Sequence, residues 1–396
     1  MEYITAFEAA ENWAVSLRQV QRLAAAGRIP GARKHARDYL IPTDAEKPGD
    51  PRYEKKDDSL SQKIANTNAA IHLYAPLDNP YAIIGVCRDE RARVIPDILL
   101  SYQRGDFYRV KRLFQEIERC GDNGDNMAVK ILTSGTAIAA AVSLGDEPFF
   151  LQIETWLKDV VRAAISPDVT SLAEYGLSIA YTGMVIHEKI PEWLKTGDFR
   201  ALPNITKPFA ACTRVQYLSQ LNKPEAMLMV AQTYLSLCGA ENVIYEPDTN
   251  LRIYCAEACM ALGREDEAKY YLRSAMKKVL PRGLISAFAE RIHPLNGLCE
   301  TLLKQEFPAY YDAVVGQCER STWNWVIFHN RYTKDNITLT LSLRDYHMAR
   351  QVALGVPYKK IAAQFNLTYG SFNNRMQIIY QKLNISGKKE LIELIL

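Results

Sequence analysis

Polar side chains near the carboxyl end of the chain share one face of a predicted helix. Within residues 368–383, apolar residues recur at Phe372, Met376, Ile379 and Leu383, which is the spacing of a buried helix face. The opposite face carries Ser371, Asn373, Asn374, Arg375 and Gln377. Amides and guanidinium groups can pair with base edges through two hydrogen bonds, and hydroxyls can hold phosphates. This polar edge therefore has the chemistry of a nucleic-acid contact.

Two further helices are predicted to position the polar edge. Ser342 and Asp345 have the spacing of a reciprocal cap, so a helix is expected to begin there and to end at Gly355. Pro357 suits the first position of a second short helix, and Thr368 can cap the third. Three short helices with a tight turn before the last are typical of a helix-turn-helix, whose last helix lies in the major groove of DNA.

The same residues resemble a known family. The segments NLTYGSFNNR at 366–375 and IYQKLNI at 379–385 are similar to the LuxR-type carboxy-terminal DNA-binding domain. This resemblance implies that residues 339–396 bind double-stranded DNA. Two positions differ from the family pattern, because Asn373 replaces a phosphate-binding lysine and Pro357 replaces the hydroxyl that usually caps the second helix.

Basic residues are concentrated in the same final domain. The whole chain has a net charge of +3, but residues 344–396 hold eight Lys or Arg against three Asp or Glu. A positive end is the one that attracts phosphates. Lys382, near the end of the third helix, is expected to secure the DNA backbone.

Residues 1–47 contain a second basic unit. Thr5 and Ser16 can each cap a helix, and Gly27 can end the second of them. Short strand-like pieces with a basic tip between them follow, and this pattern predicts a hairpin. The candidates for DNA contact are Arg18, Gln19 and Arg22 on the helix, with Arg33, Lys34 and Arg37 on the hairpin.

This amino-terminal unit resembles the winged helix-turn-helix of excisionase-like and MerR-like proteins. The segments that carry the resemblance are YIT at 3–5, RQVQR at 18–22 and GRIPGA at 27–32. It implies that the hairpin acts as a wing on the phosphate backbone or in the minor groove. A small packing domain with a solvated basic loop is the alternative.

The middle of the chain is expected to be a linker followed by helices. Residues 48–88 are predicted to be a linker, because residues 42–61 combine prolines and mixed charges and have no apolar period. Residues 89–338 are predicted to be helical. Small or apolar residues recur five and twelve positions after two turn glycines, in Gly105–Val110–Ile117 and Gly263–Ala268–Ala275. That spacing resembles tetratricopeptide repeats, so an α-helical repeat array with a concave binding face is expected.

No catalytic or metal-binding constellation is evident in the sequence. Nucleotide-binding glycine loops and the Gly-x-Ser-x-Gly elbow are missing, the six histidines are isolated, and the eight cysteines include no Cys-x-x-Cys. We therefore expect no enzyme, cofactor or metal, and cysteines that are buried free thiols. Trp323, Trp325 and His329 are candidates to wall an effector pocket, with packing as the alternative.

Composition places the protein among ordinary globular chains. Hydrophobic residues make up 48% and charged residues 23% of the sequence. The start of the chain shows no signal-peptide pattern, and the weakly polar run at 137–144 is too short to span a membrane. A cytoplasmic protein without a membrane partner is expected.

Together these patterns predict a mainly α protein with a winged helix-turn-helix, a helical-repeat core and a LuxR-type end. The function they favour is that of a bacterial transcriptional regulator, whose core senses a ligand, peptide or partner protein. A homodimer would place two recognition helices one DNA turn apart, roughly 34 Å. The alternative is a protein–protein interaction scaffold with degenerate helix-turn-helix ends, which Asn373 supports.

Overall fold

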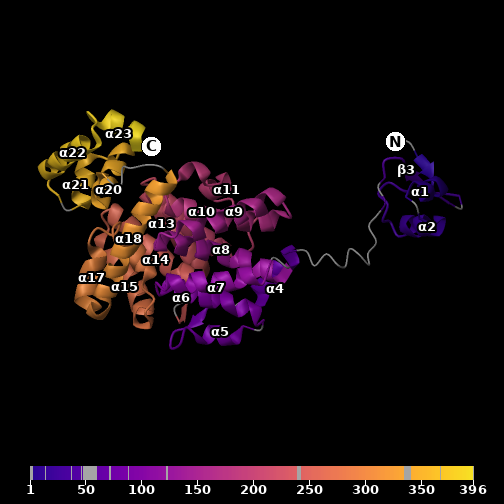
Figure 1. Cartoon of the computed structure of the whole chain (residues 1–396), viewed down its shortest axis with the longest axis horizontal. Coiled ribbons are helices and arrows are strands. Elements are labelled where there is room, and N and C mark those ends of the chain that lie inside the picture. Colours follow the sequence, from indigo (N-terminus) through magenta and orange to yellow (C-terminus); the bar gives the residue numbers. More distant parts are fainter. Residues whose placement is uncertain are drawn as a thin grey trace. The chain divides into compact units, whose positions relative to one another are not determined.

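A computed structural model gives the fold of the chain (Figure 1). The structure describes residues 3–13, 15–36, 38–45, 47, 60–70, 73–87, 89–121, 124–238, 242–333, 340–365 and 367–395. Within these residues the protein is mainly helical, as expected, and its strands are few and short. Contacts divide the chain into two compact units, Met1–Ser59 and Leu60–Leu396.

The first unit combines two helices with a small antiparallel sheet. Its elements are β1 (Tyr3–Thr5), α1 (Ala6–Asn12), α2 (Leu17–Ala25), β2 (Arg33–His35) and β3 (Asp38–Pro42). The sheet has the order β1-β3-β2. Strands β2 and β3 form the predicted hairpin, and β1 pairs with the other edge of β3. Buried apolar side chains from both helices and from β3 form one core under the sheet.

Both predicted helix starts in this unit are present. The Thr5 hydroxyl accepts a hydrogen bond from the Glu8 backbone N–H at 3.2 Å, and the Glu8 carboxylate accepts one from the Thr5 N–H at 2.8 Å. Ser16 caps α2 by accepting a bond from the Gln19 N–H at 3.3 Å. These caps satisfy N–H groups that have no partner inside the helix.

The predicted linker is too long at its carboxyl side. Within 48–88 the structure describes α4 (Leu60–Ala70), β4 (Ala75–Pro76) and α5 (Ala82–Val86). Ile64 is 1% exposed and Ile83 is 3% exposed, so these elements belong to the core. The prolines and charges of 48–58 dominated the composition and hid the buried helical stripe that follows. Residues 48–59 lie outside the described part.

The central helices follow one another along residues 91–333. They are η1 (Arg91–Arg93), α6 (Val94–Gln103), α7 (Phe107–Arg119), α8 (Gly124–Leu144), α9 (Glu147–Ala163), α10 (Pro167–Gly183), η2 (His187–Lys189), α11 (Glu192–Thr196), α12 (Lys207–Gln220), α13 (Pro224–Cys238), α14 (Glu246–Ala261), α15 (Glu265–Val279), η3 (Leu280–Arg282), α16 (Ser286–Arg291), α17 (Leu298–Glu306), η4 (Pro308–Tyr310) and α18 (Tyr311–Thr333). A two-residue strand, β5 (Val243–Ile244), precedes α14 and pairs with β4. Many of these helices pack on their neighbours in sequence, and alternate helices such as α8 and α10, or α12 and α14, also touch (Figure 1).

The turn glycines that the sequence singled out occupy the backbone conformation that ends a helix. Gly105 has φ +79° and Gly263 has φ +75°, backbone angles that residues with a Cβ rarely adopt. The residues five and twelve positions later are all buried, as expected. Gly145, with φ +67°, begins another such series that the sequence analysis did not identify, and it is followed by buried Phe150 and Leu157.

Helix α8 is the most apolar of the long helices. By length and composition alone it is long enough to cross a membrane, although most of it is buried inside the protein. It touches α4, α6, α7, α9, α10 and α18. This burial among six helices is what a central core helix requires.

The cysteines follow the expectation with two exceptions. All eight are free thiols, and six of them are buried. Cys238 is half-buried, and Cys120 is exposed near the end of α7. The expectation of uniform burial is therefore wrong for Cys120, which lies on the solvent side of an amphipathic helix.

The final helices are α20 (Leu343–Ala353), α21 (Tyr358–Gln364), α22 (Tyr369–Leu383) and α23 (Lys388–Ile395). They pack around their own cluster of buried apolar side chains, among them Met348, Val352, Phe372, Met376 and Ile379. Pro357 is the N-cap of α21, so this helix begins at Tyr358, one residue later than predicted. The three predicted helices are therefore present with boundaries close to those expected.

Candidate functional site

Helix α22 presents the predicted polar edge to solvent. Thr368 caps the helix, since its hydroxyl accepts a hydrogen bond from the Ser371 N–H at 3.1 Å. Ser371, Asn374 and Gln377 are exposed, while Asn373 is half-buried. Phe372, Met376 and Ile379 fill the core on the other side, as predicted. The edge is therefore held at a fixed orientation by buried residues of the same helix.

Arg375 and Lys382 are held by an acid that the sequence analysis assigned to another role. The Arg375 Nε lies 2.5 Å from Asp345 Oδ1, and its Nη2 lies 2.7 Å from Oδ2. Lys382 Nζ lies 3.7 Å from the same carboxylate. Asp345 is completely buried, whereas the side chains of both cations are 41% exposed. The hydrogen bonds to Asp345 raise the pKa of Arg375.

This arrangement corrects the expected reciprocal cap of α20. Ser342 does accept a hydrogen bond from the Asp345 N–H, at 3.1 Å. The Asp345 carboxylate faces α22 instead of returning to Ser342. Asp345 therefore ties α20 to α22 and fixes the helix that carries the polar edge. Only the long-range fold decides between these two partners for the carboxylate.

The first unit exposes the basic side chains expected of it. Arg18 and Arg22 are exposed on α2, with Gln19 half-buried between them. Arg33 and Lys34 are exposed on β2, and the Arg33 guanidinium lies 5.2 Å from the centre of the Tyr3 ring. Arg37 lies outside the described residues.

A hydrogen bond fixes the hairpin to the helix of the first unit. Gln21 Nε2 donates to Asp38 Oδ1 at 3.0 Å, which connects α2 to the start of β3. Arg18 and Arg22 therefore belong to the same rigid unit as Arg33 and Lys34, as a winged arrangement requires.

Two of the three residues expected to wall an effector pocket attach one helix to another. Trp325 donates from Nε1 to the Gly183 carbonyl at 2.9 Å, and His329 Nδ1 lies 3.0 Å from the Met184 carbonyl. Their rings stack at 4.7 Å, so both attach α18 to the end of α10. Trp323 is 68% exposed. None of the three lines the cavity described next, which lies among α6, α8, α10, α12, α14 and α16.

Alternate central helices surround this cavity, which we call the interhelical cavity. It has a volume of about 200 Å³ and receives side chains from α6, α8, α10, α12, α14 and α16. On the measure in which one water needs ~10–15 Å³, it has room for on the order of ten waters. The sequence predicted a concave face but gave no sign of a bounded cavity.

Contacts between the first and last of these helices close the ring around the cavity. The Ile285 N–H donates to the Gln103 carbonyl at 2.8 Å, and the Ser286 hydroxyl donates to the Tyr102 carbonyl at 2.5 Å. The Tyr102 hydroxyl also donates to Glu290 Oε1 at 2.6 Å. These bonds join the end of α6 to α16, so the first and the last of the six helices are in direct contact.

Two carboxyl groups face the interhelical cavity. Burial, and then the neighbouring charge of Glu290, raise the pKa of Glu246 to about 7. Burial also raises the pKa of Glu290, although Tyr102 and Arg291 oppose that rise. Gln103 Nε2 donates to Glu246 at 3.2 Å. Among the described residues, neither acid has an ion pair.

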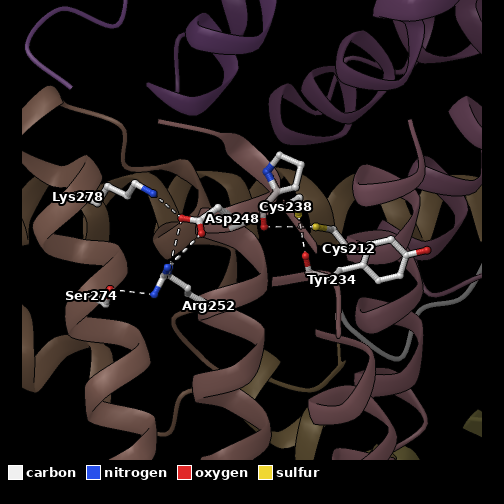
Figure 2. A network of polar contacts seen from close by, with 8 residues as sticks. Cys212, Tyr234, Cys238, Asp248, Arg252, Ser274 and Lys278 are labelled. Carbon is white, nitrogen blue, oxygen red and sulfur yellow. Dashed lines mark hydrogen bonds and ion pairs between the residues drawn. The ribbon is translucent and has the colours of Figure 1, made fainter. Parts of the chain in front are cut away.

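Figure 2 shows a different arrangement two residues along the same helix. Asp248 is completely buried and lies between Arg252, at 3.2 Å, and Lys278, at 2.7 Å. Arg252 also donates to the Ser274 hydroxyl at 3.1 Å, which links α14 to α15. The thiols of Cys212 and Cys238 bond to backbone carbonyls nearby. In this network the charge of the carboxylate is compensated by two cations of the chain itself.

Comparisons with known proteins give no relative: no protein family model, no curated protein and no solved structure matches the chain. The basis for a function is therefore the geometry of the polar edge, the basic first unit and the interhelical cavity.

Proposed function

We propose that the protein is a DNA-binding transcriptional regulator whose helix α22 enters the major groove. The observation that carries this proposal is the exposed edge of Ser371, Asn374 and Gln377 on a helix anchored through Asp345. Amide side chains pair with adenine through two hydrogen bonds. A rigid helix with such an edge meets the requirement that recognition groups be held in place before binding.

We assign different roles to the polar residues of α22: some contact DNA, and others hold the helix in position. Asn374 and Gln377 are the proposed base contacts, and Ser371 with Asn373 contact phosphates near the helix start. The Nε and Nη2 groups of Arg375 both donate hydrogen bonds to Asp345. We therefore propose that Arg375 holds α22 in place. Lys382 keeps enough exposure to reach the backbone as well.

The first unit is proposed to act as a second DNA-binding module of the winged helix-turn-helix type. Its exposed Arg18, Arg22, Arg33 and Lys34 supply positive charge from both the helix and the hairpin. Phosphate contacts of this kind raise affinity without reading sequence. In this proposal the regulator works in the cytoplasm as a homodimer, and the central helices form a tetratricopeptide-like sensor core.

Loss of the amides tests the proposal. A genome-wide footprint of the bound protein defines a site, and fluorescence anisotropy then measures the affinity of full-length variants for it. Asn374→Ala and Gln377→Ala should each weaken binding by about 1–3 kcal/mol, or roughly 5- to 150-fold, because each removes a two-bond base contact. Gln62→Ala, an exposed amide on α4, is the control and should leave affinity unchanged. Unaltered binding by both folded variants would show that α22 does not read DNA.

The scaffold alternative makes a different prediction in the same assay. Asn373 favours it, because an amide at this position lacks the positive charge with which the lysine of the LuxR-type pattern binds a phosphate. True phosphate contacts make affinity fall steeply as salt rises. A scaffold with degenerate ends would show no saturable DNA binding even at low salt.

A further inference from the structure

We infer that the interhelical cavity binds a small organic cation, with an apolar or aromatic body and one ammonium group placed between Glu246 and Glu290. Its role as an effector rests on the proposed function, whereas the binding itself does not. Three features of the cavity lead to this ligand class: its size, its uncompensated acids and its aromatic walls.

The size of the cavity favours a small molecule over a peptide or a protein. Two of the helices that line it are joined where α16 bonds to the end of α6 through backbone and side-chain groups. The space that remains, about 200 Å³, accommodates a compact organic molecule. The surface of a folded partner cannot enter it.

The charges of the lining favour a cation. Among the lining residues the charged side chains are Glu246, Glu290 and Arg291. Arg291 is already engaged, because its Nε lies 3.1 Å from Glu257 Oε2 and its Nη2 donates to the Ser219 hydroxyl at 3.1 Å. Neither acid therefore forms an ion pair with a described residue of the chain. An ionised acid inside a protein is costly unless it is paired, and a bound ammonium group would provide the pair.

Aromatic rings complete a site for such a cation. Tyr102, Tyr175, Phe209 and Tyr254 line the cavity together with aliphatic side chains of α8 and α10. The faces of aromatic rings attract ammonium groups, and the aliphatic walls suit an apolar body. An anionic ligand would instead meet two acids and an arginine that is already paired.

One further polar group in the lining points to a missing ligand. Thr249 lies on α14, one turn after Glu246, and it is 4% exposed. Its hydroxyl oxygen has no hydrogen-bond partner among the described residues. Buried hydroxyls are normally satisfied, so an unsatisfied one beside a cavity is suited to a bound molecule that brings a donor or acceptor.

Direct binding measurements on the full-length protein test the inference without DNA. The probes are benzylamine, 2-phenylethylamine, cyclohexylmethylamine and hexylamine, each matched with the carboxylate of the same carbon skeleton. Thermal-shift measurements at pH 8 rank the probes, and calorimetry gives the affinity of the best amine. At least one amine should stabilise the protein, while its matched carboxylate should bind at least tenfold more weakly.

Isosteric variants locate the ammonium group. Glu246→Gln and Glu290→Gln should each weaken the best amine at least tenfold, because each removes one of the paired charges while keeping the shape. Glu265→Gln, an exposed acid on α15, is the matched control and should leave amine affinity unchanged. Circular dichroism confirms that every variant is folded.

Two outcomes would overturn the inference. One is a panel in which no amine stabilises the protein more than its matched carboxylate. The other is an amine whose affinity is unchanged in both Glu246→Gln and Glu290→Gln. Adding the best amine to the anisotropy assay then separates the proposals, since binding without any effect on DNA affinity would retain the cation site and remove only its role as an effector.

Discussion

Four acids of this protein fall into two groups that differ in how their charge is compensated. Asp248 and Asp345 are completely buried, and each lies beside two cations supplied by the chain itself. Glu246 and Glu290 line a cavity and form no ion pair among the described residues. The first arrangement fastens helices together, and the second leaves a charge to be completed from outside. Substitution should therefore have opposite effects on stability in the two groups.

The largest expected effect is at Asp248. Asp248→Ala leaves Arg252 and Lys278 close together and almost buried, with 16% and 8% of their side chains exposed. Breaking a buried ion pair in this way typically costs about 3–5 kcal/mol of unfolding free energy. Urea unfolding followed by circular dichroism measures the loss. Glu265→Ala removes the exposed partner of Lys269 and should change stability by less than about 0.5 kcal/mol. Equal effects of the two variants would contradict the structural role of Asp248.

Substitution of Glu246 is expected to increase the unfolding free energy at alkaline pH, whereas substitution of Asp248 lowers it. A carboxyl whose pKa rises from 4.5 to about 7 on folding holds its proton more tightly in the folded state. The unfolding free energy should therefore fall as pH rises from about 4.5 to about 7, by roughly 3 kcal/mol in total. Glu246→Gln stays neutral, so it should be more stable than the natural protein at pH 8 by up to about that amount and equal to it near pH 4.

Unfolding of both proteins at several pH values checks this prediction. The difference between the two proteins gives the contribution of Glu246 together with its repulsion from Glu290. Glu290 is the charged neighbour that raises the pKa further. A variant that is less stable than the natural protein at pH 8 would mean that Glu246 has a cation nearby after all.

A smaller loss is expected at Asp345. Its partners Arg375 and Lys382 are 41% exposed, so water compensates part of the lost attraction when Asp345→Ala removes the acid. We expect a destabilisation of about 1–3 kcal/mol, together with weaker DNA binding because α22 loses its anchor. Chemical unfolding and anisotropy measure the two effects. Asn374→Ala is the matched comparison, since it should weaken DNA binding while leaving stability within about 0.5 kcal/mol. A stable Asp345→Ala protein with normal affinity would refute the anchoring role.

Local sequence signals predicted the parts of the fold that depend on neighbouring residues. The caps at Thr5, Ser16 and Thr368 and the turns at Gly105 and Gly263 are all present, because caps and positive-φ turns depend on a few adjacent positions. The mainly α character followed from apolar spacing in the same way. The helix that begins at Leu60 was missed because an unpatterned, charged segment directly precedes it.

The sites were harder to predict because they depend on residues far apart in the chain. The polar edge of α22 was visible in the sequence, but the pairing of Arg375 with Asp345 spans 30 positions and competes with a local cap. Trp325 and His329 have the composition of a pocket wall, yet they pack against α10. The cavity acids Glu246 and Glu290 come from separate helices, and they line one site only when the chain has folded so that α16 contacts α6. Glu246 carried no sequence signal that distinguished it from Asp248.

The bond from Ser286 to Tyr102 joins positions 184 residues apart. Contacts between such distant residues form late, since the intervening chain must first be ordered. During synthesis the lining therefore remains unfinished until α16 has left the ribosome. A molecule that occupies the cavity can consequently stabilise only chains in which α16 has already emerged, so the supply of that molecule would also affect how many copies survive proteolysis.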